Sequence, residues 1–468
     1  MNTIVTNNIQ IYRPTSFILD WIDNNLIVNN PTYQTMKLLG KEDNIKRCHI
    51  PEHLYLYSQR GEYYILPYGV LYALWGEISK YPYAIKLNIG GFNSICKMQP
   101  KSPMYDYQEK AVQAMLAAKS GVLVAQCAAG KTYMGIELIR RIGKKALWLC
   151  HTGDLLRQAQ QDMLDQYPTI KIGLTTEGKL EIGEDVTIST IQTMDKIDPN
   201  LYKNEFDIVI CDECAHVAGS PTQMKMFQRI ISNIPARYKF GLTATPARSD
   251  GMIKSMYAYI GLSMNGEFEP TYKIERDEVK TMPSIHKKIE IESGYDEDKL
   301  YDLYDASGMM SYTLLINNLC ENDIRTEKIL ENVKECQKEG RKQVILSGRV
   351  SHCEKMVEML QNDGYKAILC VGKVSDKKRK EILTNVENWD ILVATYSLLK
   401  EGVSIKPLDT LHLATPVKDK SIVVQSAGRI ERYLEGKKQP IVYDYVDIDI
   451  PYCVKAYSSR KSSLRKRF

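Results

Sequence analysis

The sequence predicts an α/β protein with two tandem parallel-sheet domains and a small N-terminal α+β accessory domain. From about residue 122 to about residue 262, short apolar or β-branched runs alternate with helical patterns, and the alternation starts again at residue 343. This alternation is typical of βαβ units on a parallel sheet. The chain has 468 residues, which is too long for one ordinary core, so two or three domains are expected.

The N-terminal region, residues 1–100, is rich in Tyr. Residues 17–26 have the pattern of a short helix, and residues 54–67 predict a hairpin around Gly61. Tyr interspersed with Lys and Arg can bind nucleic acid, but Tyr in a hydrophobic core is the commoner case. We therefore expect a small accessory domain, for which DNA binding is one candidate role.

The first parallel-sheet domain is expected at residues 101–265 and the second at residues 321–455. Their strand-like runs are residues 122–125, 146–150, 186–189, 207–211 and 240–243, then 343–347, 367–370, 391–394, 410–414 and 441–443. Residues 353–362 predict a helix of the second domain. The less regular stretch 266–320 is expected to be a connector or insertion. Residues 456–468 form a basic tail, which is either a solvated terminus or a nucleic-acid contact.

Composition excludes several classes of protein. Hydrophobic residues make up 44% and charged residues 25% of the chain, as in ordinary globular proteins, and no apolar run has the length of a membrane span. The N-terminus lacks the pattern of a secretory signal, and the 11 scattered cysteines suit reduced thiols in a cytoplasm. We expect a cytoplasmic protein. The formal net charge of +5 permits a polyanionic partner without requiring one.

The stretch from Gly121 to Thr132 predicts a phosphate-binding loop. Its apolar run is followed by small residues, among them Ala128, Ala129 and Gly130, then by Lys131-Thr132 and a helical pattern. Backbone N–H groups at the start of such a helix bind phosphates, a Lys supplies charge and a hydroxyl binds Mg²⁺. Ala125 stands where this pattern usually opens with Gly. The alternative is an ordinary strand–turn–helix with a surface Lys.

An acidic pair follows the apolar run that ends at Cys211. Asp212 would hold Mg²⁺ and Glu213 would orient and deprotonate a water molecule, although acidic pairs are also common in solvated loops. Zinc binding by Cys211 and Cys214 would need a second ligand pair, which the sequence lacks. Thr243 and Thr245 follow another strand, where their hydroxyls are able to bond back to the acidic loop.

An arginine pair lies near the end of the second domain. Arg429 and Arg432 are three residues apart, so the spacing predicts that they share one helix face. Two guanidinium groups in this arrangement suit the charge that develops on a γ-phosphate. A surface arginine pair is the alternative, and it would be favoured if these residues were taken alone.

The order of these motifs resembles the superfamily 2 helicases, and more narrowly the restriction-type and tailed-phage branch-migration helicases. The resemblance is carried by Gln108, Ala125–Thr132, Ser189–Thr193, Asp212–His216, Gly241–Pro246, Ala394–Gly402 and Gln425–Arg432. It covers about residues 103–450. It implies two RecA-like domains with ATP bound between them, and a P-loop and a DEAD/DEAH-type acidic box in the first domain.

The resemblance also implies roles for individual residues. Lys131, Asp212, Glu213, Arg429 and Arg432 are expected to be catalytic, and Thr132 and Asp212 to hold Mg²⁺. ATP binding is expected to involve Gln108, which would recognise adenine, together with Ala128, Ala129, Gly130, Lys131, Thr132 and Gly402. Thr193, Arg349 and Thr395 match positions that contact the nucleic-acid backbone. Thr243, Thr245 and Gln425 are expected to couple the nucleotide to the domains.

Two positions depart from the family pattern. Ala215 stands where many relatives have His, with His216 one residue later, and Ser404 replaces an Asp. The first change places the coupling of the ATP site to the second domain in doubt, and the second affects a ribose or interdomain contact. Neither removes a group that hydrolysis needs.

These features predict a monomeric, ATP-dependent DNA helicase or translocase that acts on single-stranded, forked or branched DNA, without membrane association. RNA is a less favoured substrate. The alternatives are an RNA helicase, which uses the same motifs, and an ATP-gated nucleic-acid-binding module without unwinding activity. The motor part of a restriction complex would call for a nuclease domain, and none is recognisable in the sequence.

Overall fold

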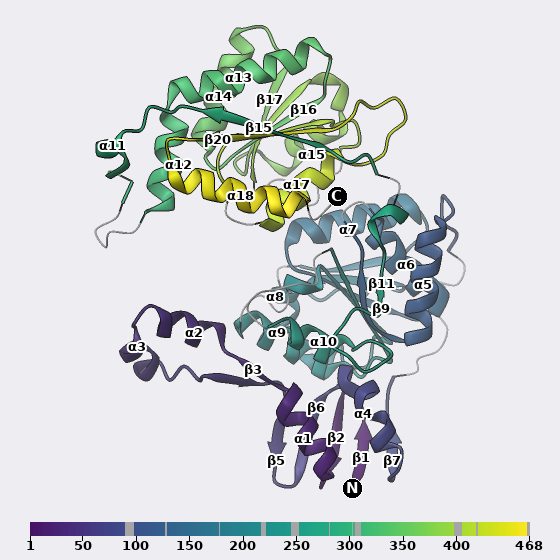
Figure 1. Ribbon diagram of the computed structural model, residues 1–468. Coiled ribbons are helices and arrows are strands. Elements are labelled where there is room, and N and C mark those ends of the chain that lie inside the picture. Colours follow the sequence, from purple (N-terminus) through teal and green to yellow (C-terminus); the bar gives the residue numbers. More distant parts are fainter. Residues whose placement is uncertain are drawn as a thin grey trace. The chain divides into compact units, whose positions relative to one another are not determined.

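The computed structural model describes residues 1–88, 98–126, 129–176, 178–216, 221–244, 252–279, 281–301, 303–304, 310–396, 405–417 and 420–465. The chain divides into two compact units, Met1–Val279 and Lys280–Phe468. Figure 1 shows an N-terminal mixed sheet, a first parallel sheet and a second parallel sheet. The α/β class with two parallel sheets is therefore confirmed.

The N-terminal sheet has the strand order β5-β6-β2-β1-β7. Its strands are β1 (Asn2–Val5), β2 (Asn8–Tyr12), β5 (Ser58–Arg60), β6 (Tyr63–Pro67) and β7 (Tyr83–Ile85). Helices α1 (Ser16–Asn25) and α4 (Leu71–Ile78) cover one face of it (Figure 1), and their apolar residues share a core with alternate residues of β1 and β2. The expected helix and the hairpin at Gly61 are both present, because period-2 and period-3.6 patterns were clear in this stretch.

A two-stranded ribbon projects from this region. It consists of β3 (Ile27–Asn29) and β4 (His53–Tyr55), which pair antiparallel, and it carries α2 (Pro31–Leu38) and α3 (Glu42–Arg47) between them (Figure 1). Neither helix has a buried residue. The ribbon helices therefore contribute little to the core of the unit.

The first parallel sheet has the strand order β10-β11-β9-β12-β13-β8-β14. Its strands are β8 (Ser120–Val124), β9 (Ala146–Cys150), β10 (Ile172–Thr175), β11 (Val186–Thr190), β12 (Ile208–Asp212), β13 (Tyr238–Thr243) and β14 (Tyr272–Lys273). The helices of this part are α5 (Asp106–Ala118), α6 (Lys131–Ile142), α7 (Gly153–Gln166), α8 (Ile191–Met194), α9 (Pro221–Asn233) and α10 (Ile253–Ile260). Strands β8, β9 and β12 are buried throughout, as expected of a sheet covered on both faces.

The N-terminal sheet packs directly against this first parallel-sheet fold. Gly69, in the short helix η1 (Tyr68–Val70), accepts a hydrogen bond from Leu262, and a Cβ at Gly69 would lie 2.5 Å from the carbonyl oxygen of Ala258. The buried Lys239 places its Nζ 3.6 Å from the centre of the Tyr68 ring and donates to the Ala236 carbonyl. The two parts therefore share one continuous hydrophobic core.

The second unit is a six-stranded parallel sheet with the order β15-β20-β19-β16-β18-β17. Its strands are β15 (Ile285–Ile291), β16 (Gln343–Ser347), β17 (Ala367–Cys370), β18 (Ile391–Thr395), β19 (Thr410–Leu413) and β20 (Ile441–Asp447). Its helices are α11 (Glu297–Tyr301), α12 (Tyr312–Glu321), α13 (Asp323–Lys338), α14 (Val350–Asn362), α15 (Asp376–Thr384), α17 (Lys420–Ile430) and α18 (Pro451–Arg465). The five expected strands begin here at the predicted residues and end within four residues of the predicted ends.

Two stretches are more regular than their sequence patterns predict. The expected connector, 266–320, contains β15, which pairs with β20 along its whole length and so belongs to the second sheet. This strand was not predicted because it lies at the edge of the sheet. An edge strand buries few side chains, so its sequence carries charged residues in place of an apolar run. Most of the expected basic tail lies in α18, where the buried Arg460 makes a bidentate contact with Asp444. None of the described helices has the length and hydrophobicity needed to cross a membrane.

Candidate functional site

The predicted phosphate loop lies between β8 and α6, at the carboxyl end of β8, which pairs with β13 and with the short edge strand β14. Gly130 caps α6 with φ of 83°, and a Cβ at this position would lie 2.4 Å from Nε2 of Gln108. Only Gly fits this conformation and this contact without strain. The Lys131 side chain turns back along the loop, and its Nζ lies 3.3 Å from the carbonyl oxygen of Ala125. Cys127 and Ala128 lie outside the described residues.

The acidic pair lies beside the phosphate loop. Asp212 is the last residue of β12, and Glu213 follows with φ of 48°, a conformation that costs free energy for a residue other than Gly. The turn directs the Glu213 carboxylate toward the loop, where Oε1 lies 3.4 Å from Nζ of Lys131. Oδ1 of Asp212 accepts a hydrogen bond of 3.0 Å from the Glu213 backbone. Lys131, Asp212 and Glu213 therefore form one cluster.

Electrostatics in this cluster favour a bound cation. Burial, and next the negative charge of Glu213, raise the pKa of Asp212 to about 7, while the Lys131 ammonium acts in the opposite direction. A carboxylate that is destabilised by burial and by a second carboxylate gains from a positive partner. Among the described residues no group of three or more His, Cys, Asp or Glu side chains is arranged to hold a metal ion. Any metal here would have to share its coordination with another ligand.

Gln108 connects α5 to the phosphate loop. Its Nε2 donates 2.9 Å to the carbonyl oxygen of Ala129, and its Oε1 accepts 3.0 Å from the backbone of Tyr105. The hydroxyl of Tyr107 also donates to the Ala129 carbonyl, at 3.3 Å. The Gln108 side chain is buried and thereby fixes the loop. The sequence does not predict this contact, because Gln108 and Ala129 are 21 residues apart.

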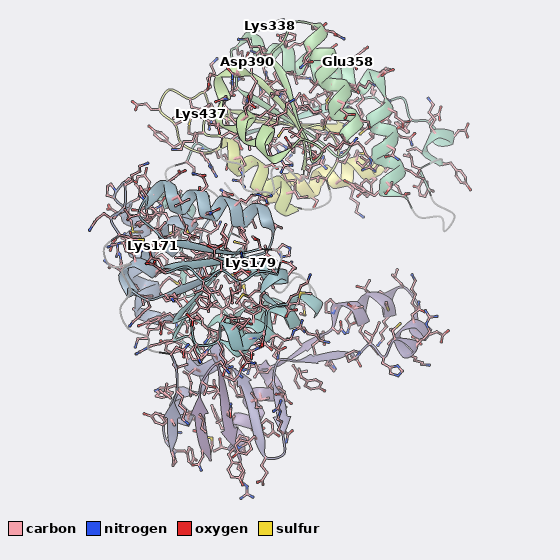
Figure 2. All side chains as sticks on the ribbon, turned by 180° about the vertical axis from the view of Figure 1, so that it is seen from behind. Lys171, Lys179, Lys338, Glu358, Asp390 and Lys437 are labelled. Carbon is pink, nitrogen blue, oxygen red and sulfur yellow. The ribbon has the colours of Figure 1, made fainter. Side chains whose placement is uncertain are left out.

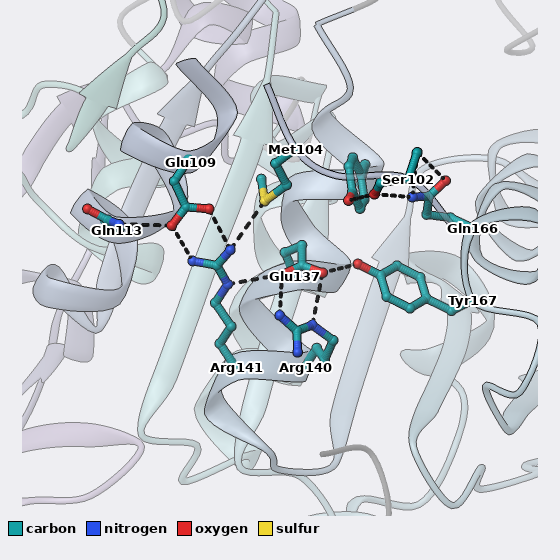
Figure 3. A network of polar contacts seen from close by, with 10 residues as sticks. Ser102, Met104, Glu109, Gln113, Glu137, Arg140, Arg141, Gln166 and Tyr167 are labelled. Carbon is teal, nitrogen blue, oxygen red and sulfur yellow. Dashed lines mark hydrogen bonds and ion pairs between the residues drawn. The ribbon is translucent and has the colours of Figure 1, made fainter. Parts of the chain in front are cut away.

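A buried polar network holds α5, α6 and α7 together behind the loop (Figure 3). The Glu137 carboxylate accepts two hydrogen bonds of 2.9 Å from Arg140, one of 2.9 Å from Arg141, and one from the hydroxyl of Tyr167. Burial alone would raise the pKa of Glu137, but these hydrogen bonds lower it below its ordinary value. Arg141 also binds Glu109 through two hydrogen bonds of 2.7 and 2.6 Å, which lower the pKa of Glu109 to about 2.

This network connects α5 to the end of α6, while Gln108 connects α5 to the loop before α6. Glu109 lies next to Gln108 on α5, and Arg141 lies at the far end of the helix that begins with Lys131. The position of α5 relative to α6, and with it the contact of Gln108 with the loop, therefore depends on Glu109, Arg141 and Glu137. These residues were not predicted from the sequence. The signal that points to them is the spacing of Arg140 and Arg141 from Glu137, at i+3 and i+4.

The other predicted residues of the first unit lie at or just after the ends of strands β8, β11 and β13 of the first parallel sheet. Thr193 is in α8, and its hydroxyl accepts 2.8 Å from Thr190, the last residue of β11. Thr243 is the buried last residue of β13, and its carbonyl accepts 3.0 Å from the backbone of Ala125. Thr245 lies outside the described residues. Thr132 is the second residue of α6.

The arginine pair of the second unit is not on one helix. Gln425 and Arg429 lie in α17, but this helix ends at Ile430, and Arg432 forms an isolated bridge with Thr281 instead. The prediction of a shared helix face is therefore wrong. The helix stops because Glu431 turns away to accept hydrogen bonds from the backbone and hydroxyl of Ser284.

A lysine helps to shape the segment after α17. Lys437, which is labelled in Figure 2, donates 2.8 Å to the carbonyl oxygen of Arg432. Burial lowers the pKa of Lys437 to about 8. Arg432 is thus held by its backbone from two sides, through Thr281 and Lys437.

The predicted backbone-contacting residues of the second unit occupy the ends of adjacent strands. Thr395 ends β18 opposite Ser347, which ends β16, and Arg349 caps α14 just beyond. The Arg349 guanidinium donates 2.6 Å to Oδ1 of Asn317 and 3.0 Å to the carbonyl of Gly348. Gly402 and Ser404 lie outside the described residues.

Comparison with known proteins agrees with this arrangement. The model of the family described as type III restriction enzyme, res subunit, matches residues 101–248, and the model of the helicase conserved C-terminal domain matches residues 325–433. The two matches together span more than half of the chain and contain all the catalytic candidates.

Two of the similar proteins are encoded by a virus and by a phage. Protein L396 of Acanthamoeba polyphaga mimivirus, provisionally named an ATP-dependent RNA helicase, is 25% identical over 88% of this chain and 76% of its own length. The ATP-dependent DNA helicase uvsW of Enterobacteria phage T4 is 28% identical over 73% of this chain and 68% of its own length. A solved structure of S. cerevisiae Dbp5 bound to RNA and ADP BeF3 has a TM-score of 0.54 at 13% identity, over 78% of this chain and 88% of that chain. This last likeness concerns the fold alone.

The two family matches, the two parallel sheets and the order of the motifs agree with one another. Each domain match falls on one parallel sheet, and the first contains the phosphate loop and acidic pair described above. The chain belongs to the superfamily 2 helicases, as an ATP-dependent enzyme with a restriction-type first domain and a helicase C-terminal second domain.

Proposed function

We propose that this helicase acts on DNA, coupling ATP hydrolysis to movement along one strand and to the remodelling of forked or branched DNA in recombination, repair or replication. The observation that carries the proposal is the cluster of Lys131, Asp212 and Glu213 at the mouth of the phosphate loop. The named function of the T4 relative supports DNA as the substrate.

The chemistry assigned to this cluster is the attack of water on the γ-phosphate of ATP. Lys131 would bind the β- and γ-phosphates, exchanging its contact with Glu213 for contacts with phosphate oxygens. Glu213 would then be free to orient the water and accept its proton. As the bond from the water oxygen to the γ-phosphorus forms, the opposite bond to the bridging oxygen breaks and ADP leaves with that oxygen. The positive charge of Lys131 would stabilise the negative charge on the transferred group.

Mg²⁺ fits the oxygen ligands at this site. The hydroxyl of Thr132 and the carboxylate of Asp212 are hard donors of the type that Mg²⁺ prefers, and two protein ligands leave room for phosphates and water. The ion would neutralise phosphate charge, and it would compensate for the buried Asp212 carboxylate.

The remaining roles are proposals of the same kind. Arg429 and Arg432 would stabilise the transition state from the second domain, with Gly402 at the nucleotide and Gln425 in coupling. Thr193, Arg349 and Thr395 would hold the phosphate backbone of the strand, which would make binding insensitive to base sequence. Thr243 and Thr245 would report the state of the nucleotide to these contacts. We expect the protein to act as a monomer.

An RNA helicase is the second candidate, because the mimivirus relative carries that name. The test is a panel of single strands, forks and four-way junctions of DNA, with matched RNA, in assays of ATP hydrolysis and unwinding. Stronger stimulation and unwinding with forked or branched DNA supports the proposal. Stimulation by RNA alone overturns it in favour of the second candidate, and stimulation without unwinding or translocation indicates an ATP-gated binding module.

A further inference from the structure

The N-terminal sheet has one face that neither α1 nor α4 covers. Alternate residues of β1, β2 and β6, including Val5, Ile9, Ile11 and Leu66, are buried against α1 and α4. The residues between them point to the opposite face. Helices α1 and α4 are drawn against a single side of the sheet in Figure 1. We call the opposite side the open face, and define it by Asn8, Gln10, Tyr12, Ser58, Arg60 and Tyr63.

Cross-strand register arranges this face in rows. Arg60 pairs with Tyr63, and Tyr63 pairs with Tyr12, so these three side chains lie side by side across β5, β6 and β2. The rings of Tyr12 and Tyr63 have centroids 5.0 Å apart, and the Tyr63 residue is 46% exposed. In the next row, Ser58 pairs with Ile65, which pairs with Gln10. Exposed aromatic rings therefore adjoin amide and hydroxyl groups.

The strands of this sheet carry positive charge but no negative charge. The five strands contain no Asp or Glu, and their one cation is Arg60, whose side chain is exposed and has no ion pair within the described part of the chain. At the end of the face, Glu62 is bound by Arg13 at 2.7 Å and by the hydroxyl of Tyr12 at 2.7 Å. The acidic residues Asp20 and Asp23 belong to α1, on the covered side.

A pocket continues the open face toward the ATPase fold. It has a volume of about 310 Å³ and is lined on the sheet side by Asn8, Gln10, Ser58 and Arg60. Gln228 and Ser232 of α9 line the other side. Its polar groups are amides, hydroxyls and one guanidinium, without a carboxylate, and the remaining lining is apolar, from Leu56, Ile65, Leu66 and Pro67. Its volume falls within the ~300–1,000 Å³ range of ligand pockets.

From this arrangement we infer that the open face and its pocket bind single-stranded nucleic acid. Tyr63 and Tyr12 offer ring surfaces on which unpaired bases stack, and Arg60 is placed to bind a phosphate beside them. The amides of Gln10, Asn8 and Gln228 are able to bond base edges in the pocket. A duplex does not present base faces to such rings, because its bases are already stacked on each other. The inference rests on the proposed function. It specifies the surface that holds the single strand on which the helicase acts.

The test is binding of a fluorescein-labelled 20-nucleotide oligothymidine, as DNA and as RNA, to the full-length protein without nucleotide, followed by anisotropy. Tyr63→Ala is expected to weaken binding about 10-fold, the loss of one stacked base, whereas Tyr63→Phe retains wild-type affinity. Tyr301→Ala, which removes a 79% exposed Tyr from α11, is the matched control and should leave Kd unchanged. Arg60→Gln should lower the slope of log K against log salt by about 0.7.

Several outcomes would overturn the inference. Wild-type affinity in Tyr63→Ala and Arg60→Gln would show that this face does not hold the strand. An equal loss in Tyr63→Phe, or in binding of a blunt duplex, would show that stacking is not the cause. Failure of the proposed function looks different, because wild-type protein would then show no ATP hydrolysis stimulated by nucleic acid, whatever the effect of these variants. ATP hydrolysis without nucleic acid should stay unchanged in all of them.

Discussion

The ammonium group of Lys131 lies 3.4 Å from the carboxylate of Glu213, although 82 positions of sequence separate the two residues. The contact joins the first residue of α6 to the turn that follows β12. It depends on the left-handed backbone of Glu213, since an extended residue would direct its carboxylate elsewhere. The backbone conformation thus brings together the group proposed to bind phosphate and the group proposed to activate water.

Substitution of Lys131 by Ala should strongly reduce ATP turnover. The variant loses the cation proposed to bind the β- and γ-phosphates, so we expect kcat/KM for ATP to fall by a factor of about 100 or more in the presence of DNA. The matched control is Lys179→Ala, because Lys179 is exposed (Figure 2). Unchanged turnover in Lys131→Ala, with the far-ultraviolet circular dichroism of a folded protein, would contradict the site.

Substitution of Glu213 by Gln should separate binding from hydrolysis. Gln retains the shape of the side chain but does not accept a proton from water, so we expect ATP affinity to persist while kcat falls about 10²–10⁴-fold. Binding of a fluorescent ATP analogue and release of phosphate measure the two properties independently. Glu181→Gln changes an exposed residue of the same domain and should leave both properties unchanged. A parallel loss of affinity and turnover would argue for a structural role of Glu213.

Replacement of Arg432 by Gln should reduce kcat with little effect on ATP affinity. Arg432 is held by its backbone through Thr281 and Lys437, so the substitution leaves these contacts in place. If the guanidinium contacts the developing phosphate charge, turnover should decrease about 10³-fold or more. Arg47→Gln, in the exposed helix α3, is the control. Normal turnover in Arg432→Gln would exclude this role for it, irrespective of Arg429.

Glu137 should contribute strongly to the stability of the first unit. Glu137→Gln removes the charge that Arg140 and Arg141 share behind the phosphate loop, and we expect a loss of roughly 2 kcal/mol in the free energy of unfolding. The KM for ATP should also rise, because Gln108 would lose its fixed position. Urea unfolding and steady-state kinetics measure the two effects. Glu335→Gln breaks the exposed pair with Lys338 (Figure 2) and should change neither.

The second unit should lose stability in acid. Burial lowers the pKa of His352 and of His412 to about 3, well below the ordinary value near 6.5. Both residues accept protons more readily when the chain is unfolded, so their contribution is fully present above about pH 6.5 and is lost as the pH falls toward 3. Hydrogen exchange of the β19 and β16 peptides between pH 7.5 and pH 4.5 checks this, after correction for the intrinsic exchange rate.

His412→Gln should make this pH dependence shallower. His412 bonds the Tyr445 hydroxyl and Gln343 at 2.9 Å each, so Gln retains hydrogen-bonding capacity without a titrating ring. The variant is expected to be less stable than wild type at pH 7.5 and to approach it at pH 4.5. An unchanged slope would indicate that other groups cause the acid sensitivity.

The central strands of both domains were predictable because their patterns are strong. Ala146–Cys150, Gln343–Ser347 and Ala367–Cys370 match the structure at both ends. Continuous burial produces continuous apolar runs, and these stand out against the helices between them. The edge strand β15 has no such apolar run, because its exposed positions include Lys287, Lys288 and Glu290.

The chemistry of the site was predictable as residue types but not as geometry. The motif order identified Lys131, Asp212 and Glu213, whereas the positive φ of Glu213 and the loop contact of Gln108 depend on segments far apart in sequence. The end of α17 before Arg432 was also not predictable. Glu431 accepts a hydrogen bond from Ser284, which precedes β15 and is distant in sequence. Local spacing does not carry such information.

The packing of Gly69 against α10 and Leu262 limits how this chain can be shortened or recombined. Because Gly69 and Tyr68 fill the surface formed by α10 and the start of β13, a fragment beginning at residue 101 would expose apolar side chains such as Ile260 and Ala258 to water. Such a fragment would be prone to precipitate. Exchange of the accessory sheet between related enzymes should succeed only when α10 is transplanted with it.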